Sequence, residues 1–199
     1  MTVSQEADPL DRRILVTGDV NTGKTTQCRR WLEALCRQGL GHRIALLDLA
    51  PTIPPDLARA RGMRGVGGEL RPPPECGVLD LRALLVPPRL SSTSDAEALA
   101  KARDNAEVID ALIARLRPER DILFINDVTL FLQARTATRL IDTADFGSRT
   151  TIIVNGYRGE RLGGGELTRH EAAEMAELVR LFSATGEVLH FTQRYDVSH

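Results

Sequence analysis

The sequence predicts a three-layer α/β domain in which helices flank a mostly parallel sheet of about five strands. Short apolar runs suited to buried strands alternate along the chain with longer amphipathic stretches suited to helices, and glycine or proline ends many of them. The length of 199 residues fits one domain. Together these observations favour a single compact α/β unit.

Five apolar runs carry the strand prediction, at 14–16, 43–49, 121–126, 150–154 and 187–192. Helices are expected at 23–38, 94–116, 128–144 and 168–182. In the first helix Cys28, Trp31, Leu32 and Leu35 recur at the spacing of one buried face. Capping-box patterns at Ser94 and Thr168 predict the starts of two later helices.

The remaining segments set the domain organisation. Residues 1–10 are polar and are expected to form a flexible N-terminal tail rather than a secretory signal, followed by one domain over 11–199. Residues 51–88 are rich in proline, glycine and arginine, and predict an irregular functional or mobile loop. Within that loop, the apolar pieces at 78–79 and 84–86 would form a strand or turns.

Composition excludes several classes of protein. With 26 basic and 27 acidic residues, the chain lacks the basic footprint of a nucleic-acid or anionic-membrane partner. No apolar run approaches the roughly 20 residues of a membrane helix. Three cysteines without a paired pattern favour a reducing cytoplasm, and four histidines show no metal-ligand spacing. We therefore expect a cytoplasmic protein without a structural metal site.

The most specific motif is Gly18-x-x-x-x-Gly23-Lys24-Thr25, placed between an apolar run and an amphipathic helix. Glycines let successive N–H groups face phosphate oxygens, and the helix N-terminus adds a positive dipole. A lysine supplies a cation for the β- and γ-phosphates, and a threonine hydroxyl suits magnesium. The expected nucleotide-binding residues of this loop are Gly18, Asp19, Val20, Asn21, Thr22, Gly23, Lys24, Thr25 and Thr26.

By this motif and its alternating layout, the chain resembles the P-loop NTPase superfamily. The resemblance implies a P-loop NTPase fold that binds a nucleoside triphosphate with Mg²⁺. A guanine-reading N-K-x-D motif would need lysine at 156 and aspartate at 158, where this chain has Gly156 and Arg158. ATP is therefore favoured over GTP.

Candidate acids follow two of the predicted strands. The family pattern puts an acid at 126, but this chain has Asn126 followed by Asp127. Asp127 is a candidate to hold magnesium or orient the attacking water, and Asp48, at a carboxyl strand end, is a second candidate. Thr25 with Asp48 or Asp127 would hold the metal, while Lys24, Asp127 and Asp48 are the candidate catalytic residues. Which acid serves magnesium stays open.

Other polar residues suggest further contacts. Asn155 follows a strand and is a candidate γ-phosphate sensor, or else a turn-forming residue. An arginine-rich stretch with Arg59, Arg61, Arg64 and Arg71 would bind an anionic acceptor, or would be a solvated connection. A glycine-rich patch at 156–165, with Arg158 and Arg161, would cover the base or form a turn.

Three functions remain open at this stage. The first is a magnesium-dependent P-loop ATPase acting with an unknown acceptor or protein partner. The second is a small-molecule kinase or related group transferase, with Asp48 as base and the 51–88 loop as acceptor site. The third is a slow nucleotide-dependent switch or assembly factor, suggested by Asn126 in place of an acid. A homodimer is compatible with all three.

Overall fold

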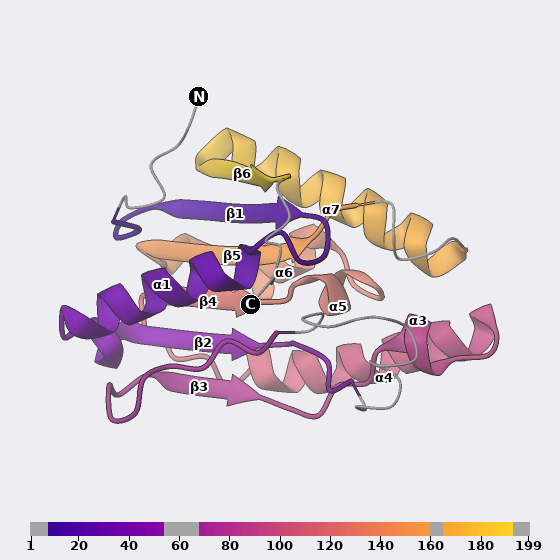
Figure 1. The fold of residues 1–199 in the computed structure, drawn as a ribbon, viewed down its shortest axis with the longest axis horizontal. Coiled ribbons are helices and arrows are strands. Elements are labelled where there is room, and N and C mark those ends of the chain that lie inside the picture. The colour runs from indigo at the N-terminus through magenta and orange to yellow at the C-terminus, as the bar shows by residue number, and fades with distance from the viewer. Residues whose placement is uncertain (1–7, 54–67, 160–164, 193–199) are drawn as a thin grey trace, which may run out of the picture.

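The structure, a computed structural model, describes residues 8–53, 68–159 and 165–192. Its centre is a six-stranded sheet of order β3-β2-β4-β5-β1-β6, and every adjacent pair is parallel (Figure 1). The strands are β1 (Arg13–Gly18), β2 (Ile44–Asp48), β3 (Leu79–Arg82), β4 (Ile122–Asn126), β5 (Thr151–Tyr157) and β6 (Glu187–Phe191). The predicted α/β class with a parallel sheet is confirmed.

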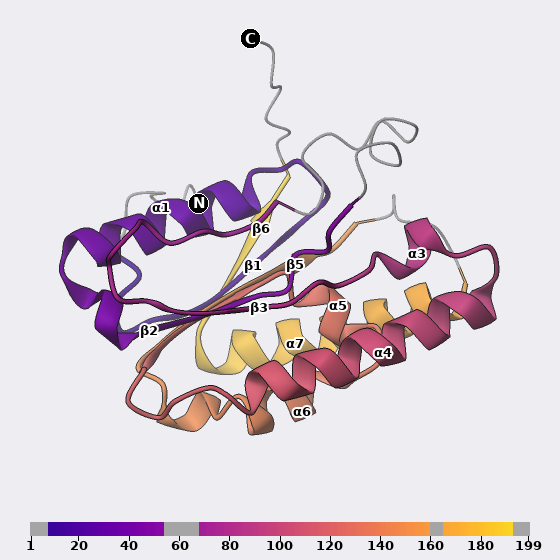
Figure 2. The ribbon, with the colours of Figure 1, turned by 90° about the horizontal axis from the view of Figure 1, so that it is seen from below.

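Helices cover both faces of the sheet. Figure 2 shows α1 on one face and α4, α5, α6 and α7 on the other, so the predicted three layers are confirmed. The helices are α1 (Lys24–Arg37), α3 (Pro88–Ser91), α4 (Asp95–Ile113), α5 (Thr129–Leu132), α6 (Ala137–Thr143) and α7 (Glu166–Thr185). Two 3-10 turns, η1 (Leu40–Arg43) and η2 (Phe146–Ser148), precede β2 and β5.

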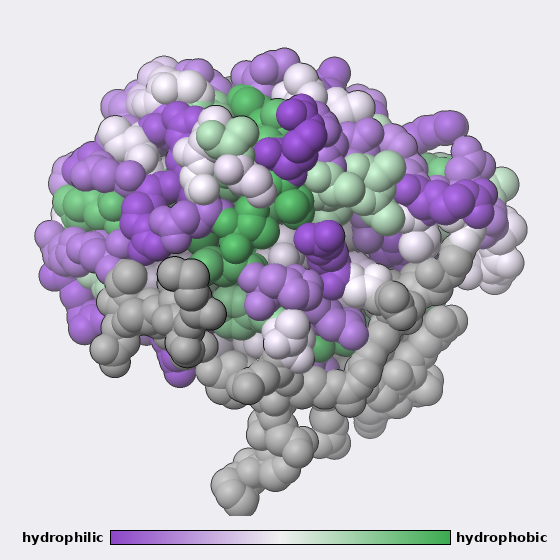
Figure 3. Space-filling model, turned by 90° about the horizontal axis from the view of Figure 1, so that it is seen from above, coloured by the Kyte–Doolittle hydropathy of each residue, from purple (hydrophilic) through white to green (hydrophobic). Residues whose placement is uncertain are grey.

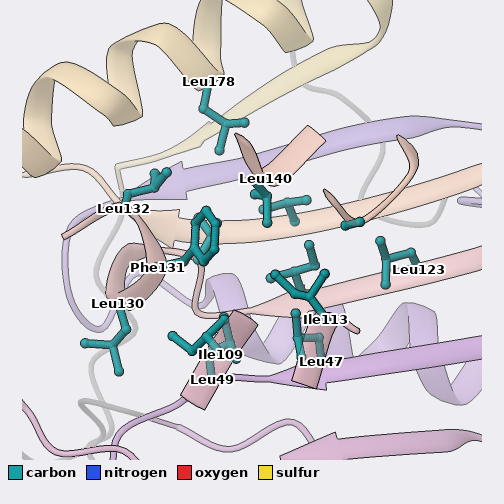
Figure 4. Close-up of a cluster of buried hydrophobic side chains, with 14 of the residues drawn as sticks. Leu47, Leu49, Ile109, Ile113, Leu123, Leu130, Phe131, Leu132, Leu140 and Leu178 are labelled. Atoms are coloured by element: carbon teal, nitrogen blue, oxygen red, sulfur yellow. The ribbon is translucent and has the colours of Figure 1, made fainter. Parts of the chain in front are cut away.

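The two faces of the sheet belong to two separate hydrophobic clusters, because successive strand residues point to opposite sides. The larger cluster lies under α4–α7 and joins strand residues to leucines and isoleucines of those helices, as Figure 4 shows for Leu47, Leu123, Ile109 and Leu178. The smaller cluster lies under α1. It contains the four residues predicted for the buried face of that helix, Cys28, Trp31, Leu32 and Leu35.

The strand that the sequence left unresolved is β3, at the edge of the sheet beside β2. Its burial is incomplete, with only Leu81 fully buried among its four residues. An edge strand that is covered on few sides needs no long apolar run, which explains why its pattern is weak. The rest of 51–88 is irregular where it is described, apart from α3 at its end.

Two helix predictions are corrected by the structure. The single helix expected at 128–144 is two short helices, α5 and α6, because the chain breaks after Gln133 and Thr136 caps a new start by accepting from Arg139 N. The predicted cap at Thr168 is wrong, since α7 already begins at Glu166 after Gly165. Ser94 does cap α4, and its Oγ accepts from Glu97 N at 3.2 Å.

The opposite edge of the sheet is formed by β6. Its Val188, Leu189 and Phe191 are only partly buried, as expected for a strand with one neighbour. Figure 3, viewed from the side on which β6 lies, shows a central group of hydrophobic residues among hydrophilic ones. Among the residues that the structure describes, no helix is both long and apolar enough to cross a bilayer.

Candidate functional site

The site is built at the carboxyl ends of the parallel strands, where the Gly18–Thr25 loop joins β1 to α1 (Figure 1). Three residues of this loop have positive φ angles: 152° at Gly18, 59° at Asn21 and 89° at Gly23. Alternation between left-handed and right-handed conformations turns successive N–H groups towards a common concavity, a form suited to anions. The helix that follows adds the positive end of its dipole.

Lys24, the first residue of α1, lies buried under this loop with 9% exposure. Its Nζ donates to the carbonyl oxygens of Gly18, at 3.0 Å, and Asp19, at 2.7 Å. Burial lowers the pKa of Lys24, while the negative charges of Asp127 and Asp19 act in the opposite direction. The ammonium group is thus held at the loop by neutral carbonyls, and a phosphate would supply a stronger partner.

The other loop residues fix its shape. Thr22 is buried, and its hydroxyl donates to Asp19 O at 2.9 Å. Val20 N donates to the Asp19 carboxylate at 2.7 Å. Gly18 O also accepts from Arg158 N at 3.0 Å, which joins the loop to the end of β5. Thr26 is exposed on the first turn of α1.

Three polar residues lie at or near the carboxyl ends of neighbouring strands on the α1 side of the sheet. Asp48 and Asn126 are the last residues of β2 and β4, whereas β5 continues two residues beyond Asn155, so the expected strand end at 154 and the turn at Asn155 are wrong. In β2, Ile44 and Leu46 belong to the cluster under α1, so Asp48 falls on the same side. The same alternation places Asn126 after Phe124 in β4, and Asn155 after Ile153 in β5. Asp48 and Asn126 are also direct neighbours in the sheet register. Asp48, Asn126 and Asn155 are respectively 3%, 1% and 1% exposed.

These side chains form one hydrogen-bonded chain with the phosphate loop. Asn126 Oδ1 accepts from Asn155 Nδ2 at 2.6 Å and from Thr25 Oγ1 at 3.4 Å. Asn126 Nδ2 donates to Asp48 Oδ1 at 2.7 Å and to Gly68 O at 3.1 Å. Asn126, whose type departs from the family pattern, is therefore the central residue of this cluster.

Asp48 is held on its other oxygen as well. Asp48 Oδ2 accepts from Leu70 N at 3.1 Å and lies 3.3 Å from Arg82 Nη1 of β3. Burial raises the pKa of Asp48, and the Asn126 amide and the Arg82 charge oppose that rise. Leu70 and Arg82 were not singled out from the sequence. Their roles depend on contacts across the 51–88 segment, which no local pattern reveals.

Asp127 has different neighbours from the buried cluster. Its Oδ1 accepts from Thr129 N at 3.0 Å and from the Thr129 hydroxyl. The Asp127 carboxylate therefore binds the first residue of α5. The same Thr129 hydroxyl accepts from Tyr157 N at 2.8 Å. Asp127 is partly exposed and influences the pKa of Lys24. The Asp127 carboxylate thus binds Thr129 and also lies close enough to Lys24 to act on its charge.

The arginines expected to meet an anion are only partly described. Arg71 is exposed and pairs with Glu69, and Arg158 is exposed. Arg59, Arg61, Arg64 and Arg161 lie outside the described residues. The described end of that segment does reach the site, because Gly68 lies against Thr25 and its carbonyl accepts from Asn126.

The donor set at the strand ends fits Mg²⁺. The hydroxyl of Thr25, the amide oxygen of Asn126 and the carboxylates of Asp48 and Asp127 all offer oxygen, which magnesium prefers. Among the described residues there is no cluster of three or more histidine, cysteine or acidic side chains arranged for a metal. A magnesium ion here would therefore depend on few protein ligands and on the phosphates themselves.

Comparison with known proteins assigns no family to the chain. No family model matches the chain, and no curated protein matches it. A solved structure that does match is described as "Crystal structure of Pif1 helicase from Candida albicans". It is 11% identical, covers 93% of this chain and 37% of the helicase chain, and has a TM-score of 0.34. A likeness at this level carries no argument about activity.

The structure shows how the residues of the candidate site are arranged. A loop with three positive φ angles follows the first strand, a lysine and a threonine open the next helix, and polar side chains lie at or near the carboxyl ends of the neighbouring strands. The six-stranded parallel sheet with helices on both faces is consistent with a P-loop NTPase fold.

Proposed function

We propose that the protein binds ATP with Mg²⁺ at the Gly18–Thr25 loop and hydrolyses it as a P-loop NTPase. The observation that carries this proposal is the direct link between the phosphate loop and the strand ends, through the contacts of Thr25 with Asn126 and of Asn126 with Asp48. Phosphate-binding and metal-binding groups would then meet at one place. Because phosphoryl transfer depends on positioning and charge stabilisation, such a meeting point is what the reaction requires.

Each group has a distinct role in this proposal. Lys24 would leave the carbonyls of Gly18 and Asp19 for the β- and γ-phosphates, and Thr25 would hold magnesium. The metal, when bound, would neutralise phosphate charge. Asn155 would contact the γ-phosphate. Asp127 binds Thr129 through Oδ1 and would orient the attacking water with Oδ2. ATP is preferred to GTP because the guanine-reading motif is missing at 155–158.

The buried state of Asp48 weighs against the kinase alternative. A general base must reach the acceptor hydroxyl directly or through one water. Asp48 is 3% exposed and both of its oxygens already accept hydrogen bonds. The same geometry suits a carboxylate that stabilises the site rather than one that takes a proton from a bound substrate.

A slow nucleotide-dependent switch is the second candidate. One observation favours it: the residue at the centre of the site is the neutral Asn126, and the carboxylate directly after β4, that of Asp127, is hydrogen-bonded to Thr129. Turnover without a partner would then be slow, and a partner or acceptor would accelerate it. The two candidates share the nucleotide site and differ in the rate of phosphate release by the protein alone.

The test is calorimetry with ATP, GTP and ADP, with and without Mg²⁺, alongside phosphate release in the same samples. We expect magnesium-dependent ATP binding by the natural chain and a loss of at least about tenfold in affinity for Lys24→Ala, because the removed ammonium group contacts two phosphates. Lys101→Ala is the matched control, since Lys101 lies on α4 and contacts Glu97 and Ser91.

The outcomes separate the hypotheses. Binding that Lys24→Ala abolishes and Lys101→Ala preserves would support the site, and the rate of phosphate release would then choose between an independent ATPase and a slow switch. If the folded natural chain binds none of the three nucleotides, the proposed function is wrong.

A further inference from the structure

The pair formed by Asp48 and Asn126 has a property that neither residue has alone. The two side chains end adjacent strands, face the same side of the sheet and meet at 2.7 Å. Both are almost completely buried. The pair can carry one negative charge, because Asp48 has an ionisable carboxyl group and Asn126 has a neutral amide.

The contacts of Asn126 fix which way its amide points. Its Nδ2 donates to two oxygens, that of the Asp48 carboxyl group beside Arg82 and the carbonyl of Gly68. Its Oδ1 faces two donors, Asn155 Nδ2 and the Thr25 hydroxyl. Rotation of the amide by 180° would oppose like groups at Asp48, Gly68 and Asn155, and only the Thr25 hydroxyl could adapt, because a hydroxyl can also accept. The oxygen of Asn126 is therefore directed at the residue that would hold magnesium.

A carboxylate at position 126 would disturb this arrangement. Two carboxylate oxygens would then meet at the place where the present donor and acceptor are 2.7 Å apart, in a site with almost no solvent exposure. Like charges that close cannot both remain ionised. The carboxylate of Asp48 is in turn fixed by Leu70 N and Arg82. The sheet thus accommodates one anion in this pair, and that anion is on β2.

We propose that Asp48 and Asn126 together replace the single acid expected beside magnesium. Asp48 provides the negative charge, and the Asn126 amide oxygen faces Thr25. Asp48 is a positioning residue in this scheme: it holds and polarises the Asn126 amide. The proposal rests on the proposed nucleotide function and deepens it. It predicts that the charge and the amide can exchange places between β2 and β4.

The test uses Asp48→Asn, Asn126→Asp and the exchanged double variant, with Asp142→Asn on the exposed face of α6 as control. Three quantities are measured for each chain: thermal unfolding without ligand, ATP affinity with and without Mg²⁺, and phosphate release. Binding with and without metal separates a magnesium-side effect from general damage, which would lower both.

Each single variant should weaken magnesium-dependent ATP binding by about tenfold or more, since each disturbs a charge-assisted hydrogen bond in a buried site. Asn126→Asp should also lower the unfolding temperature, because it adds a second buried carboxylate. The double variant restores one carboxylate and one amide, but it leaves the Gly68 carbonyl without its donor and Arg82 with an amide in place of the Asp48 carboxylate. We expect it to recover to within about fivefold of the natural chain.

Two results would overturn the proposal. If Asn126→Asp alone strengthens magnesium-dependent binding or turnover, a carboxylate serves better than the amide at position 126. If the double variant is no better than the weaker single variant, the two residues do not act as a pair. A natural chain that binds no nucleotide would instead reject the proposed function, and the unfolding measurements would then show whether the pair is coupled structurally. Should Asn126→Asp not fold, Asp48→Asn and the double variant still make the comparison.

Discussion

Gly156 illustrates how closely single residues constrain the region beside the site. It follows Asn155 in β5 and points to the opposite side of the sheet, towards α5 and α7. A Cβ at this position would lie 2.5 Å from Met175 Cε and 2.8 Å from Val128 Cγ1. The methionine end is flexible, but Val128 is a branched residue directly before α5 and has little room to move. A side chain here would therefore push α5 away from β5.

We expect Gly156→Ala to destabilise the fold. Forced repacking costs about 1–3 kcal/mol and outweighs the roughly 0.4–1 kcal/mol that alanine gains by restricting the unfolded chain. The free energy of unfolding in urea measures the difference. Gly147→Ala is the control, because the nearest atom to its Cβ would be Asp145 Oδ1 at 3.9 Å. Equal stability of the two variants would contradict the packing argument.

Between elements, the most deeply buried ion pair joins α3 to α7. Arg89 Nη2 lies 2.5 Å from Glu171 Oε2, with side-chain exposures of 14% and 4%. The same Glu171 oxygen accepts from Gln133 Nε2 at 2.9 Å, and Arg89 Nε donates to Thr168 at 3.2 Å. Burial raises the pKa of Glu171, and the Arg89 charge opposes that rise. Thr168 and Glu171, the two ends of the pattern expected to cap α7, thus bind Arg89 instead.

Removing one member of this pair should cost more than removing both. Arg89→Met leaves Glu171 buried without its cation, and loss of one partner from a buried pair costs about 3–5 kcal/mol. In Arg89→Met/Glu171→Met no charge remains buried, so part of that loss should be recovered. A double-mutant cycle in urea measures the coupling. Arg180→Met, which breaks an exposed pair with Glu177, is the control and should leave stability unchanged.

If the losses in unfolding free energy of Arg89→Met and Glu171→Met simply add in the double variant, the two side chains are not energetically coupled. The contact between α3 and α7 would then depend on packing alone.

At the scale of the whole sheet, ion pairs connect the strands at their amino ends, and the candidate site lies at their carboxyl ends. Asp121 precedes β4 and accepts from Arg43, before β2, at 2.9 Å and 2.5 Å. It also accepts from the Thr150 hydroxyl, before β5, at 2.8 Å. The Arg43 guanidinium holds the pKa of Asp121 at about 2, below the ordinary value of 3.8. One carboxylate therefore links three strands at the end opposite the phosphate loop.

This carboxylate should make the fold sensitive to acid. Because its pKa is lowered by folding, its contribution is present above about pH 4 and is lost as the pH falls towards about 2. The side chain is 23% exposed, so after allowance for screening we expect about 1 kcal/mol. Urea unfolding at pH 7, 5, 4 and 3 should show Asp121→Asn less stable than the natural chain at neutral pH, with the difference shrinking below about pH 4.

Arg43→Met should show the same pH pattern, because Asp121 then loses its strongest partner. A stability difference for Asp121→Asn that stays constant from pH 7 to 3 would contradict the assigned role.

The sequence carried much of the architecture. Apolar runs at Ile14–Val16 and Ile122–Ile125 predicted buried strands because parallel strands are covered on both faces. It missed the extent of β3, whose edge position leaves three of its four residues incompletely buried. It also merged α5 with α6, since their apolar residues continue without a clear break in composition. Weak burial and short helices give weak periodicity.

For the candidate site, the Gly18–Thr25 loop could be predicted because its motif lies in consecutive residues. Its partners were only partly visible. Asp48 and Asn155 were marked by their positions after apolar runs, while the central place of Asn126 was missed because its type departs from the family pattern. The alternation Ile44-Leu46-Asp48, Phe124-Asn126 and Ile153-Asn155 was a signal in the sequence that these three side chains share a face.

By itself, then, the sequence determined the fold class, the approximate positions of most strands and the Gly18–Thr25 motif, because local periodicity and contiguous motifs encode these features. Only the tertiary structure decided that Asn126 joins Thr25 to Asp48, that Leu70 and Arg82 hold that carboxylate, and that Asp127 contacts Thr129. These contacts depend on strand order and register between segments far apart in the chain. No local pattern specifies such contacts, so the arrangement of the candidate site follows only from the assembled sheet.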